Sequence, residues 1–231
     1  MLQVNCRSIY KKALEFWNLV DTYNPDIIIG TESWLREEIG NTEIFTEDFT
    51  TFRRDRNARV GGVFICVKNN IACSELWVDD EFEMITVEVK GSDPKCTWEI
   101  VGIYRAPNGD IRVIEMLAAR TGFLGNSMKR DIIGGDLNLP QVDWKGITSV
   151  TKAFIERLVW DNGYTQVVGK PTRGDLLLDV YLVRPESALI SCSTVQEISD
   201  HCGVLLDVEW AEKCFVTQEK GLVHAYHKPN V

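Results

Sequence analysis

The apolar residues of this chain occur mostly in short runs, and this feature constrains its fold more than any other. Runs of four to eight residues rich in Val and Ile are typical of strands. They predict strands at 2–5, 26–30, 63–68, 84–90, 97–104, 131–134, 176–183, 188–195 and 204–210. Apolar residues at helical spacing predict helices only at 10–23, 111–120 and 150–160. The predicted strands therefore outnumber the predicted helices.

This order of elements indicates an α/β fold. Connections that contain helices lie in different halves of the chain, which predicts a four-layer α/β sandwich, with two packed mixed β-sheets flanked by helices. The strands at 63–68, 84–90 and 97–104 are expected to pair as a meander. A doubly wound sheet is the alternative, but it fits this meander poorly, and no Gly-x-Gly-x-x-Gly fingerprint follows a strand.

The length and the apolar content indicate one large domain. The chain has 231 residues, 45% of them hydrophobic, which is enough to bury a sizeable core. We expect a domain at 1–210 and a polar tail or linker at 211–231. No apolar run reaches the ~20 residues of a membrane span, and the N-terminus does not resemble a signal peptide. The seven cysteines include no Cys-x-x-Cys pair, so we expect an intracellular protein with reduced thiols and no zinc.

The net charge of -9 argues against general affinity for nucleic acids, because contacts to the DNA backbone are made by clustered Lys and Arg. Basic residues nevertheless form three clusters: Arg53, Arg54, Arg56 and Arg59; Lys11 and Lys12; Lys170 and Arg173. Taken alone, each cluster is most simply a solvated surface. Together they could form one basic rim around an acidic centre.

Polar side chains suited to metal-assisted phosphodiester hydrolysis stand near the ends of the apolar runs. The clearest group is Ser199-Asp200-His201, which places an imidazole beside a carboxylate. Because a His beside an Asp is common in proteins, the whole set and not this pair indicates a phosphodiesterase. The other members, in chain order, are Asn5, Thr31-Glu32-Ser33-Trp34, Tyr104, Gly134-Gly135-Asp136-Leu137-Asn138 and Leu178-Asp179.

In this order the motifs resemble those of the endonuclease/exonuclease/phosphatase superfamily, whose fold is a two-sheet α/β sandwich, and the resemblance covers nearly the whole chain. Three connecting segments are more specifically similar to the apurinic-type endonuclease domain of non-LTR retrotransposons. These are Tyr104-Arg105-Ala106-Pro107, the stretch from Asp136-Leu137-Asn138 to Asp143-Trp144, and the stretch from Asn162-Gly163-Tyr164 to Lys170-Pro171-Thr172-Arg173-Gly174. Because no reverse transcriptase follows, we expect an excised domain or a truncated element.

The chemistry suggests a role for each polar residue at the first strand ends. Glu32 is expected to bind Mg²⁺ or Mn²⁺, helped by Asn5 and Asp200, because hard cations prefer carboxylate oxygens. An exposed Glu without function is the alternative. Asp136 would orient or deprotonate the attacking water, and Asn138 would donate its amide to the phosphate. Gly134 and Gly135 are expected to let the substrate approach closely.

His201 would donate a hydrogen bond or a proton to the scissile phosphate, while Asp179 keeps the imidazole in the useful tautomer and raises its pKa. The resemblance implies the same two roles. Tyr104 would bond a phosphate oxygen. A structural His, a turn-capping Asp and a half-buried core Tyr remain the alternatives. The candidate DNA contacts are Arg105, Thr172, Arg173 and Ser199.

The resemblance implies a divalent-metal-dependent endonuclease that acts in the nucleus on double-stranded DNA. It would leave a 3′-hydroxyl primer for a reverse transcriptase to which it is fused or with which it acts. A phosphoesterase of the same fold, either an apurinic repair endonuclease or a phosphatase for a small or lipid phosphate, is the alternative. A non-catalytic binding module is a third possibility, but every expected catalytic position holds a competent residue.

Overall fold

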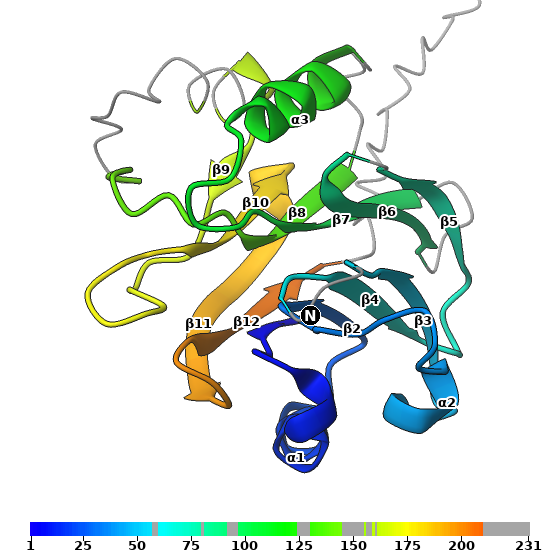
Figure 1. The fold of residues 1–231 in the computed structure, drawn as a ribbon. Coiled ribbons are helices and arrows are strands. Elements are labelled where there is room, and N and C mark those ends of the chain that lie inside the picture. Colours follow the sequence, from blue (N-terminus) through cyan, green and yellow to red (C-terminus); the bar gives the residue numbers. More distant parts are fainter. Residues whose placement is uncertain are drawn as a thin grey trace, which may run out of the picture.

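The computed structural model describes residues 1–56, 60–79, 81–91, 97–123, 130–144, 155, 159 and 161–209. These residues form two six-stranded sheets that pack face to face, with α1 (Ala13–Tyr23) and α3 (Arg112–Phe123) on opposite outer sides (Figure 1). This is the predicted four-layer α/β sandwich. The predicted helix at 150–160 lies almost entirely outside the described residues, and the predicted tail lies wholly outside them.

The sheets are mixed, as predicted, because each has one parallel pair at its centre. In space the first sheet has the order β11 (Leu189–Glu197), β12 (Cys202–Val208), β1 (Leu2–Asn5), β2 (Ile27–Thr31), β4 (Val63–Lys68), β3 (Phe49–Arg54). The second has the order β5 (Cys73–Val78), β6 (Glu83–Lys90), β7 (Thr97–Tyr104), β8 (Arg130–Asp136), β10 (Asp179–Arg184), β9 (Thr165–Gln166). Strand β1 runs parallel to β2, and β7 runs parallel to β8.

Three hydrophobic clusters fill the three spaces between the four layers. In β2, Ile27 and Ile29 belong to the cluster between the sheets, while Ile28 belongs to the cluster under α1. This alternation explains why the strand is apolar on both faces. Helix α1 contributes Phe16, Leu19 and Val20, and α3 contributes Val113, Ile114, Leu117 and Ala118. None of the helices in the described residues is long and apolar enough to cross a membrane.

The predicted meander was wrong in one strand. Strand β4 pairs with β2 and β3 in the first sheet, whereas the antiparallel meander of the second sheet is β5–β6–β7. Strands β3, β5 and β9, at the outer edges of their sheets, had not been predicted. Their side chains are mostly only partly buried, so their sequences lack a clear apolar pattern. The short elements η1 (Ile9–Lys11), α2 (Asn41–Ile44) and η3 (Glu186–Ala188) complete the described fold.

The topology brings six strand ends to one edge of the sandwich. Asn5 and Thr31 are register partners at the carboxyl ends of β1 and β2, and Tyr104 and Asp136 are register partners at the ends of β7 and β8. Strand β10 is antiparallel to β8 and begins there, with Asp179 opposite Asp136. Strand β12 is antiparallel to β1 and begins directly after the Ser199-Asp200-His201 group. This edge therefore collects most of the predicted polar residues.

The two glycines of β8 serve packing, so the prediction that they admit substrate was wrong. A Cβ atom on Gly134 would lie 2.6 Å from the ring of Tyr181. A Cβ atom on Gly135, whose φ is +155, would lie 1.8 Å from the carbonyl oxygen of Ile103 in β7. Because real Cβ atoms do not approach this closely, both positions require glycine for the strands and the core to meet.

Replacing Gly135 by Ala is therefore expected to lower the free energy of unfolding by about 3 kcal/mol or more, since the clash is with backbone that cannot move aside. Urea unfolding followed by circular dichroism measures the change. Gly169→Ala is the matched control, because no atom lies within 4 Å of its added Cβ. Equal stability of the two variants would contradict the packing argument.

Candidate active site

A cleft of about 420 Å³ opens at the edge where the strand ends meet. Its lining combines the loop after β1, the turn after β2, the end of β7 and the segments before β10 and β12. The polar lining residues are Arg7, Glu32, Trp34, Arg56, Tyr104, Arg173, Asp200 and His201. Asn5, Asp136 and Asp179 are buried behind them. The structure thus brings together eight of the predicted site residues.

Glu32 is held by three hydrogen-bond donors. The amide Nδ2 of Asn5 and the hydroxyl of Tyr104 each donate to its Oε1 at 3.3 Å, and the indole Nε1 of Trp34 donates to its Oε2 at 3.3 Å. The same Nδ2 of Asn5 donates to Oδ2 of Asp136 at 3.0 Å. Asn5 therefore bridges two carboxylates that come from different sheets.

The turn that carries Glu32 has an unusual backbone. Glu32 and Trp34 have φ values of +48 and +54, in the left-handed region that non-glycine residues seldom adopt. Backbone N–H groups of Ser33 and Trp34 donate to the carbonyls of Gly62 at 3.4 Å and Gly61 at 2.9 Å. The hairpin before β4 thus holds the turn in place. Backbone strain of this kind is common at functional sites.

His201 and Asp179 form a buried pair at 2.7 Å between Nδ1 and Oδ2, which is the pairing expected from the sequence. Gln3 Nε2 donates to the other oxygen of Asp179 at 3.1 Å. Burial alone would lower the pKa of His201, but the hydrogen bond and the charge of Asp179 outweigh it and raise that pKa. The imidazole is therefore oriented, and its protonated form is favoured.

Asp136 lies between these two groups. Burial, and then the negative charge of Asp179, raise the pKa of Asp136 well above its usual range. The backbone N–H of Asn138 donates to its Oδ1 at 3.0 Å. Side-chain atoms of Asp136, Asp179 and His201 lie within 4.8 Å of one another. Two buried carboxylates and an imidazole this close together, beside Glu32, fit a divalent cation, whose hard-ligand preference matches the carboxylate oxygens.

The orientation of Asn5 matters for its predicted role as a metal ligand. Its nitrogen faces the two carboxylates, while its Oδ1 accepts the backbone N–H of Arg7 at 3.2 Å. The Nδ2 group of Asn5 thus lies between the carboxylates of Glu32 and Asp136, at the position where the two carboxylates would stabilise a cation. For Asn5 to coordinate a cation through oxygen, its amide must rotate.

Of the four predicted DNA contacts, only Arg173 lines this cleft. Thr172 is 1% exposed, and its hydroxyl accepts the backbone N–H groups of Leu178 at 3.2 Å and Asp179 at 3.1 Å. Ser199 Oγ donates to the carbonyl of Asn5 at 2.7 Å. Both hydroxyls thus brace the segments on which the site is built.

Arg105 connects the loops that follow β7 and β8. Its guanidinium donates to the carbonyls of Leu137 at 3.2 Å and Asn138 at 3.0 Å. In return, the Nδ2 of Asn138 donates to the carbonyl of Arg105 at 2.9 Å. These bonds fix Asn138, whose φ is +46, beside Asp136. Arg105 therefore supports the site in this structure, and its contact with DNA remains a prediction.

The basic rim expected from the sequence is formed only in part. Arg53 has its side chain 11% exposed and bonded to Asp55, to Asn41 and to backbone carbonyls, so it is a structural residue. Arg56 lines the cleft but is paired with Glu83 at 3.2 Å. Arg59 lies outside the described residues. The rim near the cleft consists mainly of Arg7, which sequence analysis had missed, together with Arg173.

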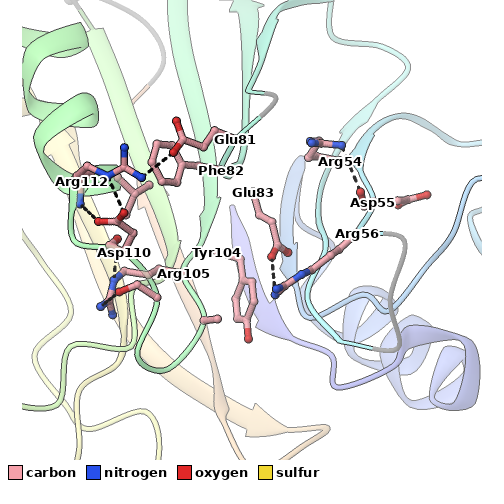
Figure 2. Close-up of a pocket in the computed structure, with 13 residues that line it drawn as sticks. Arg54, Asp55, Arg56, Glu81, Phe82, Glu83, Tyr104, Arg105, Asp110 and Arg112 are labelled. Atoms are coloured by element: carbon pink, nitrogen blue, oxygen red, sulfur yellow. Dashed lines mark hydrogen bonds and ion pairs between the residues drawn. The ribbon is translucent and has the colours of Figure 1, made fainter.

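A neighbouring pocket of about 440 Å³ shares Arg56, Tyr104 and Ala106 with the cleft. Figure 2 shows two of its arginines paired with carboxylates, Arg112 with Asp110 and Glu81, and Arg56 with Glu83. Four arginines and four carboxylates line this pocket. It therefore presents no surplus of positive charge for a phosphate.

Gln3 and Trp34 also hold site residues, although neither was predicted to do so. Gln3 sits inside an apolar strand, and no local signal marks it as the partner of Asp179. Trp34 belongs to the motif that follows β2, but only the structure shows its indole on Glu32.

No protein-family model matches this sequence, and no curated protein sequence matches it significantly. Solved structures do share its fold. The endonuclease domain of TRAS1, a telomere-specific non-LTR retrotransposon, superposes with a TM-score of 0.69 at 16% identity and covers 90% of this chain and 96% of that chain. The AP endonuclease LMAP from Leishmania major gives a TM-score of 0.70 at 14% identity, over 89% and 86% of the two chains.

The 3′ phosphatase NExo from Neisseria, bound to a product DNA hairpin, gives a TM-score of 0.67 at 16% identity, over 90% of this chain and 98% of that chain. At these identities the similarity establishes the fold alone. The chain has the α/β sandwich fold of the endonuclease/exonuclease/phosphatase superfamily, as the sequence motifs predicted.

Proposed function

We propose that this chain is a divalent-metal-dependent DNA endonuclease that nicks target DNA and leaves a 3′-hydroxyl primer for a retrotransposon reverse transcriptase. One observation carries the proposal: Asn5 joins Glu32 to Asp136 while Asp179 holds His201, all at one cleft. The fold shared with the TRAS1 endonuclease domain supports it. Such an enzyme acts in the nucleus, fused to the reverse transcriptase or together with it.

In this proposal Glu32, with Asn5, holds Mg²⁺ or Mn²⁺, which when bound neutralises charge on the phosphate and on the departing oxygen. Asp136 orients the attacking water or accepts its proton, and its raised pKa suits a proton acceptor. In the structure Asn5 and the N–H of Asn138 each bind one oxygen of Asp136, and the bond from Asn138 does not depend on the rotation of the Asn5 amide that metal binding requires. The second amide hydrogen of Asn138 is then the donor to a phosphate oxygen.

His201 acts on the phosphate from the other side of the site. Because Asp179 binds Nδ1, the ring presents Nε2 to the phosphate, and the raised pKa keeps a proton available there. With a cation on Glu32, the hydroxyl of Tyr104 would turn from Glu32 Oε1 and donate its one hydrogen to a second phosphate oxygen. Burial, and then the charge of Glu32, raise the pKa of Tyr104, so its hydroxyl remains a donor. Each proposed contact stabilises charge that grows in the transition state.

A second candidate function rests on a pocket of about 270 Å³ beside Asn138, which Pro107, Pro140, Leu176 and Leu178 help to line. A pocket with apolar lining residues next to the catalytic groups suits a sugar that has lost its base, which favours apurinic repair, although Arg105, Arg173 and other polar residues also line it. A priming endonuclease must instead accept undamaged, deformable DNA. The two functions therefore differ in the DNA that is cleaved.

We expect the protein with Mg²⁺ to nick intact supercoiled plasmid, with nicks clustered at flexible pyrimidine–purine steps. Each nick should leave a 5′-phosphate and a 3′-hydroxyl that a polymerase extends. Mapping the nicks by primer extension and end labelling measures both properties, and a parallel reaction with EDTA is the control. Cleavage only at abasic sites, or ends that no polymerase extends, would support repair or phosphatase activity instead.

A further inference from the structure

Two arginines share one carboxylate oxygen at the mouth of the cleft. Arg7 Nη1 lies 3.0 Å and Arg173 Nη2 lies 2.6 Å from Oδ2 of Asp200. Arg7 follows β1, whereas Arg173 belongs to the loop before β10, so the carboxylate joins distant parts of the chain. The side chains of Arg7 and Arg173 are 48% and 43% exposed, and both line the cleft with Glu32 and His201.

Most donor groups of these two guanidinium groups are free to bind something else. A guanidinium has five N–H donors, and among the residues that the structure describes Asp200 is the one side-chain acceptor of each. Two positive charges on one carboxylate leave a surplus of positive charge. Arg56, by contrast, is matched by a carboxylate of its own, Glu83.

The backbone holds these groups in place. Cys202 N–H donates to the carbonyl of Thr172 at 2.8 Å, which ties the segment of Asp200 to the segment of Arg173. The N–H of Arg173 donates to the carbonyl of Leu176 at 3.0 Å. The hydroxyl of Ser199 binds the carbonyl of Asn5, two residues before Arg7. The arginines are thus arranged before any ligand arrives, which lowers the entropy cost of binding.

We propose that Arg7 and Arg173 form a phosphate clamp that binds a backbone phosphate next to the scissile one on the strand being cleaved. Asp200 is then a positioning residue that keeps the two like charges together and away from Glu32 and Asp136. Planar guanidinium groups suit this task because they bind phosphate oxygens through paired hydrogen bonds. This inference rests on the proposed endonuclease function.

The test is equilibrium binding of a fluorescent DNA duplex in EDTA, measured by anisotropy over a range of KCl concentrations. Each phosphate contact contributes about 0.9 to the slope of log Kd against log salt concentration. Because both arginines bind the same phosphate, the double variant Arg7→Ala/Arg173→Ala should reduce the slope by about 0.9, and each single variant should reduce it by a part of that amount. Arg7→Lys and Arg173→Lys should restore the slope, since they keep the charge.

Lys68→Ala is the matched control, because Lys68 is paired with Asp26 at the opposite end of β4 and should leave the slope unchanged. In one outcome the wild-type protein nicks DNA while the arginine variants show the same slope of log Kd against log salt concentration as the wild type. That result would overturn the phosphate clamp and leave the proposed function standing. A wild-type protein that neither binds the duplex nor nicks it would overturn the proposed function and the clamp together.

Asp200→Asn tests the positioning role. The loss of negative charge should tighten DNA binding in EDTA by roughly threefold. Nicking should slow by about tenfold, and the Mg²⁺ concentration for half-maximal rate should stay within about twofold of the wild-type value. Asp200→Ser should behave in the same way. If both variants instead need about tenfold more Mg²⁺, with unchanged binding in EDTA, Asp200 is a metal ligand and the positioning role is wrong.

Discussion

Glu32→Ala is expected to abolish Mg²⁺-dependent nicking, with a loss of at least about 10³-fold, because Glu32 is the proposed ligand that brings the cation to the phosphate. The fold should persist. Glu32 lies at the end of β2, is only partly buried, and contacts Asn5, Tyr104 and Trp34 through single hydrogen bonds.

Plasmid nicking over a range of Mg²⁺ concentrations measures this loss, and circular dichroism melting checks the fold. Addition of EDTA to the wild-type protein should reproduce the effect. Glu37→Ala is the matched control, since this exposed glutamate of the same loop does not line the cleft. Near-normal nicking by a folded Glu32→Ala protein would refute the assignment of Glu32.

His201→Ala is expected to slow turnover by about 10³-fold and to change DNA affinity in EDTA by no more than about twofold, because the imidazole stabilises charge that develops in the transition state. Asp179→Asn should have a smaller effect of the same kind, since it disturbs the orientation of the ring but leaves the ring in place. Single-turnover nicking and anisotropy separate the two quantities. Equal losses in binding and turnover would make His201 a binding contact instead.

The pH dependence of turnover tests the role of His201 independently. Because Asp179 raises the pKa of His201, the protonated ring persists above its ordinary range, and wild-type turnover should fall as pH rises through that raised value. His201→Ala should lack this decline. The ion pair between His201 and Asp179 also stabilises the fold. Its contribution to the free energy of unfolding is fully present below the ordinary pKa of histidine and is lost as pH rises through the raised pKa of His201.

Strand prediction from the sequence succeeded where both faces of a strand are covered. For β4 and β7 the predicted bounds, 63–68 and 97–104, agree with the structure, because strands in the middle of a sandwich read as continuous apolar runs. Strands β3 and β5 went unpredicted, since partly exposed edges tolerate polar residues such as those of Phe49–Arg54. The assignment of β4 to the wrong sheet shows that strand order along the chain does not decide which strands pair.

The chemical identity of the site is also a property of the sequence. Glu32, Asp136, Asp179 and His201 were predicted because residues of these types at the ends of apolar runs are placed where strands stop, and strand ends share an edge of a sheet. Local sequence determines both the residue type and the strand end. The residue types at the strand ends therefore predict phosphodiester chemistry from the sequence alone.

Contacts between distant segments were decided only by the tertiary structure. The bridge of Asn5 between Glu32 and Asp136, the amide of Gln3 on Asp179, and the packing of Gly135 against Ile103 each join strands that the sequence separates widely. Likewise Arg7 meets Arg173 only because β12 returns beside β1 and carries Asp200 to both. The physical reason is that burial and strand ends follow from local apolar patterns, whereas side-chain partners depend on which strands pair and in which register.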